Sequence, residues 1–255
     1  LNVGNNAYAD TTMAIGRAGY QVRRFADHQL TNMLDAIREM MDSKLLDNIV
    51  LTWDNMDTEY TDPKNPINGK RLTVREIIGV YCQAMDVKEA KEKDLPDRGE
   101  EGFKKNLRDA NGNEVTYEEV IRMVHDAVAG TNLTKKLWRT INDATKFALR
   151  YQLAAGMIDQ ETFDKYDRDY YVPERGWRER DLDGREEKYN ESQGMTNGSP
   201  YNAALQKAKG RDSLASDPFA YIQSIAETSI LSAEKNKVKQ KFLQFVFDNE
   251  AIGRK

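Results

Sequence analysis

The chain has 255 residues, of which 39% are hydrophobic and 31% charged, a composition that permits a buried core beneath a strongly polar surface. Its 38 basic and 42 acidic side chains nearly cancel to a formal net charge of −4, so no overall field directs the protein to nucleic acid or to a membrane. The single cysteine, Cys82, excludes an internal disulfide and a four-cysteine zinc site. No apolar run approaches the roughly 18 residues that a membrane-spanning helix requires.

The first part of the chain has the periodicity of long helices. Apolar residues recur at helical spacing over residues 11–30 and again over about 31–52, which predicts two helices that are either separate or continuous. Three arginines of the first helix are expected to lie mostly on its outer side: Arg17, Arg23 and Arg24. The apolar positions of this helix are Met13, Ile15, Val22, Phe25 and Leu30.

Capping residues mark the next helices. Thr73, with Glu76 three residues later, predicts the start of a helix that continues through Met85, and Cys82 on this helix is interpreted as a buried structural thiol. Thr116 opens a further helix in the same way. Between these helices, the Asn111-Gly112 turn predicts at most a minor hairpin near residues 103–116.

The second part contains two strongly periodic segments. Residues 133–155 predict a helix that Gly156 ends, and Asp159 caps a short helix after it. Asp217 and Pro218 have the residue types of an N-cap and first helical position, and they predict the start of a long C-terminal helix. The apolar positions of that helix are Phe219, Ile222, Ile225, Ile230, Leu231, Val238, Phe242, Leu243, Val246 and Phe247.

One segment departs from the helical pattern. Pro173 biases Val172 toward extended backbone, and residues 178–200 are polar and rich in glycine. We expect an ordered, extended loop over about 170–200 that lies across the helices and buries Trp177. The sequence therefore predicts an all-α, irregular multi-helix bundle in one module, with main helices in 1–160, the extended loop in 161–205 and C-terminal helices in 206–255.

Motifs for catalysis and cofactor binding are missing from the sequence. His28 and His125 do not belong to a metal-binding motif, and there is neither a Gly-x-Ser-x-Gly elbow nor a phosphate-binding glycine loop. No catalytic residue, cofactor, metal or small-molecule ligand is therefore predicted. A hydrolase with an unrecognised pair of carboxylates stays as an alternative, because 42 acidic residues provide many chance pairs.

Two basic segments are candidate contacts for nucleic acid or for a partner. On the C-terminal helix, Lys235 and Lys239 share one face, whereas Lys237 and Lys241 lie on a roughly opposite face. Such lysines are either solvated or in contact with phosphates. The arginines near Trp177 either stack on bases or pair with the intervening acids. The candidate contact residues are Arg175, Trp177, Arg178, Lys235, Lys237 and Lys241.

Four short stretches in a fixed order resemble helical regions of the very large polyvalent proteins of bacteriophages and conjugative elements. They are NGKRLTVREIIGVYCQAMD from Asn68, Ala155-Gly156-Met157-Ile158 followed by Tyr170-Tyr171-Val172-Pro173, Gln193 to Asn197, and Gly210 to Ala215 leading into Ala233 to Val238. Glu174 departs from the pattern, in which leucine is more usual after the proline. The resemblance covers roughly residues 68–247 and assigns no catalytic residue.

This resemblance implies a non-enzymatic helical scaffold or interaction domain of a phage or mobile-element polyvalent protein. Its expected partners are other domains of a larger polypeptide or virion proteins, with DNA as a further candidate and no membrane. Its expected location is the virion or the bacterial cytoplasm. Because the chain begins with Leu1 and has no signal peptide, we expect it to be a piece of a longer protein. The alternative is a nucleic-acid-binding module that uses Lys235–Lys241 and Arg175–Arg185.

Overall fold

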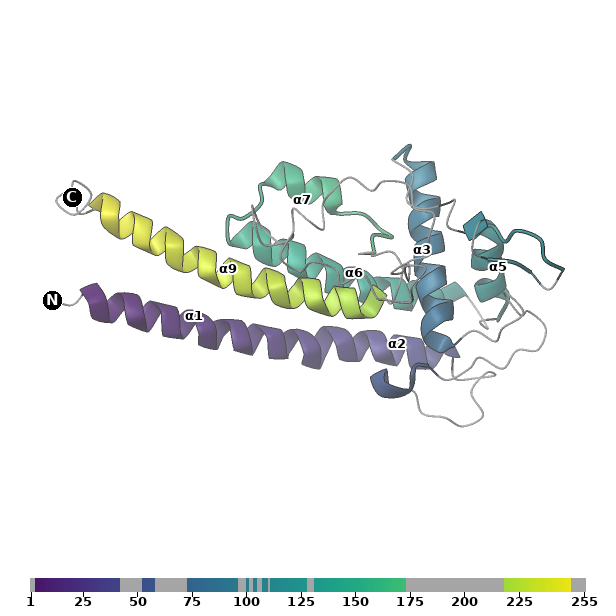
Figure 1. Ribbon diagram of the computed structural model, residues 1–255, viewed down its shortest axis with the longest axis horizontal. Coiled ribbons are helices and arrows are strands. Elements are labelled where there is room, and N and C mark those ends of the chain that lie inside the picture. The colour runs from purple at the N-terminus through teal and green to yellow at the C-terminus, as the bar shows by residue number, and fades with distance from the viewer. Residues whose placement is uncertain are drawn as a thin grey trace, which may run out of the picture.

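The computed structural model describes residues 3–41, 52–57, 73–95, 100, 103–104, 107–109, 111–127, 131–172 and 218–248. These residues form an all-α structure, which confirms the predicted fold class (Figure 1). The α-helices are α1 (Val3–Phe25), α2 (Thr31–Met41), α3 (Val74–Glu92), α5 (Tyr117–Ala127), α6 (Thr131–Ala154), α7 (Gln160–Tyr166) and α9 (Pro218–Asp248). No helix in these ranges is both long and apolar enough to cross a membrane.

The first two predicted helices are continuous. The π-helical segment η1 (Ala26–Leu30) joins α1 to α2, and its flanking residues Phe25 and Thr31 keep right-handed helical backbone. The wider π turn shifts the helical register by about one residue. Phe25 and Leu30 on either side of the shift are both buried, so the rod keeps one face toward the core across the junction.

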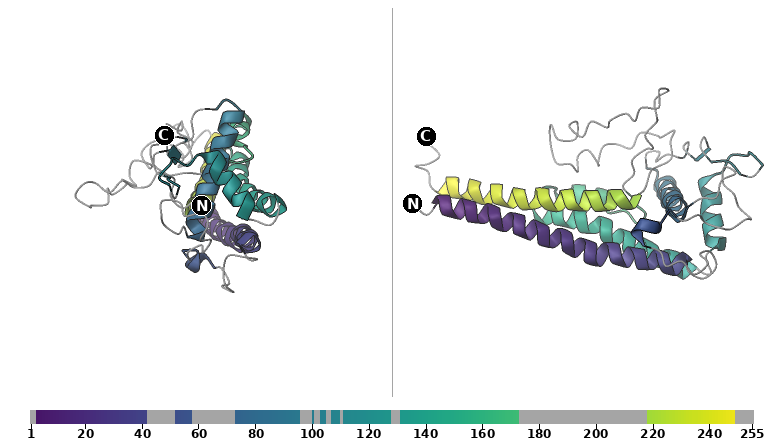
Figure 2. Two further views of the ribbon diagram at one scale, coloured as in Figure 1. Left: turned by 90° about the vertical axis from the view of Figure 1, so that its right-hand side faces the viewer. Right: turned by 60° about the horizontal axis from the view of Figure 1, so that its bottom comes forward.

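Helix α9 lies alongside both α1 and α6 (Figures 1 and 2). It runs antiparallel to α1, so the two chain ends lie at the same end of the molecule. The facing positions are small: Ala14 and Ala18 on α1 and Ala226 and Ala233 on α9 are buried. Small side chains at such positions let two helices approach closely.

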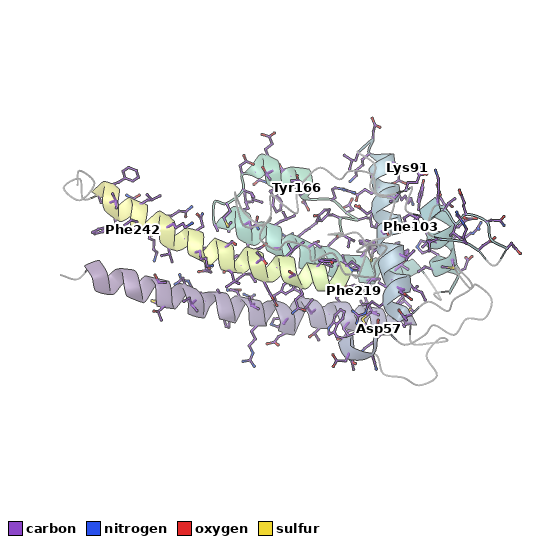
Figure 3. The ribbon with its side chains drawn as sticks, in the orientation of Figure 1. Asp57, Lys91, Phe103, Tyr166, Phe219 and Phe242 are labelled. Carbon is purple, nitrogen blue, oxygen red and sulfur yellow. The ribbon has the colours of Figure 1, made fainter. Side chains whose placement is uncertain are left out.

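The main core fills the space among α1, α2, α3, α6 and α9. Its largest fully buried members include Phe25, Met33, Ile37, Tyr81 and Ile141, and a smaller cluster around Phe103 and Val120 lies under α5. Cys82 is buried, as predicted. The 3₁₀ turn η2 (Trp53–Asn55) packs against the N-terminal end of α9. There the ring centroids of Trp53 and Phe219 are 5.6 Å apart, and Figure 3 labels Phe219.

Three of the predicted capping residues form the expected contacts, whereas the predicted N-cap Asp217 lies outside the described residues. Thr73 and Glu76 make a reciprocal capping box at the start of α3, and Thr116 and Glu119 do the same at α5. Asp159 accepts a hydrogen bond from the backbone N–H of Thr162. These contacts satisfy backbone donors that a helix leaves unpaired at its first turn, which explains why short sequence motifs locate the helix starts.

In the described residues, the hairpin predicted near residues 103–116 is limited to an antiparallel bridge between Arg108 and Glu114. The Asp109 side chain accepts hydrogen bonds from the backbone N–H groups of Asn111 and Asn113, and Gly112 has a φ of 83°. A positive φ suits glycine, which has no Cβ. The turn is therefore formed as the sequence indicates, but it does not extend into a sheet.

The structure corrects two expectations about helix faces. Met13 and Ile15 on α1, and Leu231, Leu243 and Phe247 on α9, belong to apolar positions of the sequence pattern but are exposed. Arg17, which was expected on the outer side of α1, instead reaches a buried carboxylate on α9. Most of the predicted extended loop lies outside the described residues; at its beginning, Tyr171 and Val172 are buried.

Candidate interaction surface

A buried carboxylate fastens α9 to the two helices beside it. The Glu234 side chain is 2% exposed and accepts hydrogen bonds from three donors. Arg17 Nε of α1 lies 2.8 Å away, Tyr151 Oη of α6 2.7 Å away and Lys237 Nζ of α9 itself 2.7 Å away. Lys237 also lies 4.7 Å from the centroid of the Tyr151 ring. The carboxylate thus joins all three helices.

The surroundings of Glu234 hold it in its charged form. Burial alone would raise the pKa of this carboxyl, but the hydrogen bonds from Lys237, Tyr151 and Arg17 together lower the pKa to about 2. The pKa of the Tyr151 hydroxyl is raised because burial and its hydrogen bond to Glu234 both disfavour the phenolate. At neutral pH the group is therefore a carboxylate with neutral tyrosine, guanidinium and ammonium partners.

Further polar contacts tie α9 to the end of α6. Gln152 Nε2 donates to Ser229 Oγ at 2.9 Å, and this pair is buried. Asn236 Nδ2 and Gln240 Nε2 both donate to the backbone carbonyl of Ala155, at 2.9 and 3.2 Å. A helix leaves its last carbonyls unpaired, so side chains of α9 replace the missing partners at the end of α6. This fastening ends at about Gln240.

On the side opposite the core, from Leu231 onward, α9 has an apolar face that the described residues do not cover. Leu231 is 46% exposed and Phe242 58% exposed, and Val238 and Val246 are partly exposed. Phe242 lies toward the free end of α9, and Phe219 lies at the opposite end, against α3 (Figure 3). We define the outer stripe as Leu231, Lys235, Val238, Phe242 and Val246.

The outer stripe lies on the reverse side of α9 from the core. Buried positions Ile222, Ala226, Ile230 and Ala233 follow one another at intervals of three or four residues. The members of the outer stripe also follow at intervals of three or four, but at roughly 100° of rotation per residue they are about half a turn away. Helix α9 therefore has an inner apolar face in its first half and an opposite apolar face in its second half.

The candidate lysines divide between these two sides. We call Glu234 and its three hydrogen-bond donors, Arg17, Tyr151 and Lys237, the anchor. Lys237 is bound to Glu234 and packs on Tyr151. Lys235 and Lys239 are exposed and have no ion pair with any residue in the described ranges, and Lys241 is exposed. Over residues 235–247 the sequence has four lysines and no acid. Of the other candidates, Arg175, Trp177 and Arg178 lie outside the described residues.

A second buried acidic group lies on α3. Asp86 is fully buried and accepts from Arg168 Nη2 at 2.5 Å, while Glu89 accepts from Lys93 and from the backbone N–H groups of Asp169 and Tyr170. Burial would raise the pKa of Glu89, but these hydrogen bonds and Arg168 lower it. The cluster attaches residues 168–170 to α3. Its carboxylates are engaged in structural hydrogen bonds, which gives no pair of the kind that glycosidases use.

The two histidines occupy different environments. His28 is exposed in η1, whereas His125 Nε2 is 3.1 Å from Tyr81 Oη. Burial and nearby Lys88 lower the pKa of His125, and burial raises the pKa of Tyr81 to about 12, so both groups are neutral at pH 7. No group of three or more His, Cys, Asp or Glu side chains in the described part of the chain could hold a metal ion.

A groove of about 240 Å³ lies between η1 and α6. It is lined by Gln29, Asp143, Phe147, Arg150, Tyr151 and Ala154, with the rings of Phe147 and Tyr151 stacked 5.9 Å apart. Its two charged side chains, Asp143 and Arg150, are exposed to water. A single solvated carboxylate is a poor general acid or base, because catalytic pKa values depend on desolvation and close charges.

The residues of the anchor were missed by sequence reasoning, although one signal was present. Glu234 follows Ala226, Ile230 and Ala233 on the stripe that packs into the core, and a carboxylate in such a position requires a basic or hydroxyl partner. The sequence does not show that this partner is Arg17, 217 positions away. Comparisons of the chain with protein-family models, with curated proteins and with solved structures find no match.

Proposed function

We propose that this protein is a non-enzymatic helical interaction module that presents the projecting pair of α1 and α9 to a partner. One observation carries the proposal: α9 is anchored at Glu234 and then continues past its last contact with α6 with an exposed apolar stripe. Exposed apolar side chains in contiguous groups are typical of surfaces that bind other macromolecules. A rigidly held helix also loses little conformational entropy when it binds.

The polyvalent proteins of phages and conjugative elements, which four stretches of the sequence resemble, offer a setting for such a module. In that setting the partner is another domain of the same long polypeptide or a virion protein. The C-terminal part of α9 extends, together with α1, past the end of α6, where a neighbouring domain can reach it (Figure 2). The location in a virion or in the bacterial cytoplasm is part of the same proposal.

The proposal is tested by photocrosslinking in extracts of the cells that produce the protein. A photoreactive phenylalanine analogue replaces Phe242 in one variant and the exposed Asp164 of α7 in a control variant. We expect a dominant crosslinked product from position 242, absent at position 164, whose partner binds the purified protein directly. Identical products at both positions, or none at position 242, would count against an interaction module of this design.

A nucleic-acid-binding module is the second candidate, because Lys235 and Lys239 share one exposed face. Its test is a salt titration of binding to double-stranded DNA with Lys235→Glu and Lys239→Glu combined. If two phosphate contacts are lost, the slope of log affinity against log salt should become shallower by about 1.8. Lys237 is unsuitable for this test, because its replacement would also disturb Glu234.

A further inference from the structure

We infer that the outer stripe of α9 binds an acidic amphipathic helix of a partner protein. The inference rests on the proposed function and specifies the chemistry of the partner. Its starting point is the spacing of Leu231, Lys235, Val238, Phe242 and Val246, which follow one another at intervals of four, three, four and four residues. Intervals of three and four residues form the seam through which one α-helix packs on another.

The size and position of the apolar side chains fit a helix. Leu231 and Phe242 are 46% and 58% exposed, and Leu243, 53% exposed, adds apolar surface on one flank of the stripe. A partner helix that lies in this surface would cover side chains on successive turns of α9, as amphipathic helices do when they bind in grooves. The stripe lies on the side of α9 opposite the core, so such docking leaves the anchor at Glu234 intact.

Charge determines which helix fits. Lys235 lies within the stripe between Leu231 and Val238, and Lys239 lies beside it one turn later; both are exposed and without an ion pair among the described residues. A helix that covers the stripe removes water from Lys235. The ammonium group then requires a carboxylate from the partner, because a desolvated and unpaired charge is costly. Glutamate or aspartate beside the apolar stripe of the partner meets this requirement.

The same lysines disfavour a second copy of this chain or a lipid surface as the partner of the outer stripe, and the apolar side chains disfavour nucleic acid. Lys235 and Lys239 both lie on the side of the stripe and residues 235–247 contain no acid, so two copies packed in parallel register would oppose Lys235 with Lys235 and offer a carboxylate to neither. A lipid surface would have to accommodate Lys235 in the middle of an apolar stripe, whereas interfacial helices carry lysine on the polar face. Nucleic acid offers phosphates to the lysines but no apolar surface for Leu231 and Phe242.

Designed peptides provide the direct test, with the full chain as the receptor. One helical peptide has leucine at positions a and d of each heptad and glutamate at e and g; its matched control has lysine in place of glutamate. Like charges at e and g keep each peptide from associating with itself. Fluorescence anisotropy should show at least about tenfold tighter binding of the glutamate peptide, a difference of roughly 1.4 kcal/mol.

Variants of the protein test whether the glutamate peptide binds at the outer stripe. We expect Phe242→Ser to weaken binding of the glutamate peptide at least about tenfold, and Met13→Ser on α1 to leave it unchanged. These two side chains are equally exposed, at 58% and 59%, so they are a matched pair. Combined Lys235→Glu and Lys239→Glu should reverse the preference, so that the lysine peptide binds more tightly. Circular dichroism should show all variants equally helical.

Several results would overturn the inference. They are equal binding of the two peptides, binding that Phe242→Ser does not affect, and a homodimer in sedimentation equilibrium that Phe242→Ser dissociates. Tighter binding to phosphatidylglycerol vesicles than to the glutamate peptide would also overturn it. If position 242 crosslinks to a partner while the glutamate peptide has no advantage, the interaction module stands and only the acidic character of the partner fails. Failure of both experiments removes both proposals.

Discussion

The two halves of α9 use the same helix in opposite ways. From Phe219 to Glu234 the side that faces α1 and α6 is apolar and buried, and it ends in a carboxylate with three hydrogen-bond donors. From Lys235 to Asp248 the side that continues this face holds Lys237, Gln240, Gln244 and the exposed Phe247, while Val238, Phe242 and Val246 lie on the reverse. The comparison teaches that one unbroken helix can contribute to a core and present a binding face.

This division does not appear in the periodicity of the whole helix. Apolar residues on opposite faces cancel when they are averaged over all turns, so α9 has weak overall amphipathicity although each half has a definite apolar side. The change of face occurs near Glu234, which accepts hydrogen bonds from Arg17 of α1 and Tyr151 of α6. Substitutions at neighbouring positions of α9 are therefore expected to change the free energy of unfolding by different amounts.

The largest expected contrast is between Ile230→Ala and Leu231→Ala. Ile230 is fully buried, so its truncation should lower the free energy of unfolding by about 2–5 kcal/mol. Leu231, its neighbour on the opposite face, is 46% exposed, so its truncation should lower the free energy of unfolding by less than about 1 kcal/mol. Urea unfolding followed by circular dichroism measures both. Equal losses would mean that Leu231 is covered in the free protein.

Glu234→Gln should lower the free energy of unfolding by about 2 kcal/mol at pH 7, because the amide loses the charged hydrogen bonds to Arg17 and Lys237. Glu227→Gln on the same helix is the control and should have little effect. The pKa of Glu234 is lowered from 4.5 to about 2 in the folded protein, so its contribution is complete above pH 4.5 and is lost as the pH falls toward 2.

Acid titration of stability isolates this contribution. The difference in unfolding free energy between wild type and Glu234→Gln should shrink as the pH falls from 4.5 to 2, by most of the roughly 2 kcal/mol expected at pH 7. Glu89, whose pKa is also lowered, titrates in both proteins and drops out of the comparison. A difference that stays constant over this range would show that Glu234 is not held as a carboxylate in the folded state.

Lys237→Glu and Lys239→Glu should differ in their effect on stability, although the two positions are only two residues apart. Lys237 donates to Glu234 at 2.7 Å, so a carboxylate there would lose this hydrogen bond and repel Glu234. We expect a loss of about 1 kcal/mol, limited by the partial exposure of this side chain. Lys239 is exposed on the other side of the helix, and its replacement should change stability by less than about 0.5 kcal/mol. Thermal denaturation compares the two.

The smallest expected effect on stability is that of Phe242→Ser. Because Phe242 is 58% exposed, serine should change the unfolding free energy by less than about 0.5 kcal/mol while it abolishes the aromatic contact of the outer stripe. Loss of partner binding at unchanged stability separates the exposed half of α9 from the buried half most directly. A large loss of stability would instead place Phe242 in the fold itself.

The predictable part of this fold is the part set by local interactions. The capping boxes at Thr73 and Thr116 located two helix starts, and Gly156, with a φ of 65°, ends α6 where the pattern of residues 133–155 indicated. Cap contacts and a left-handed glycine involve residues within one or two turns, so their sequence signals are complete in themselves. The exposure of Met13 and Phe242 was not predictable in this way, since it depends on which helices lie nearby.

By itself, then, the sequence determined that the protein is helical, where most of its helices begin and end, and that Lys235 and Lys239 share a face apart from Lys237. Tertiary structure alone decided that Arg17 and Tyr151 meet Glu234, and that the apolar side chains of the second half of α9 remain outside the core. The physical reason is the range of the interactions. Hydrogen bonds of a helix connect residues four apart, whereas burial depends on the packing of segments more than 80 positions distant in the chain.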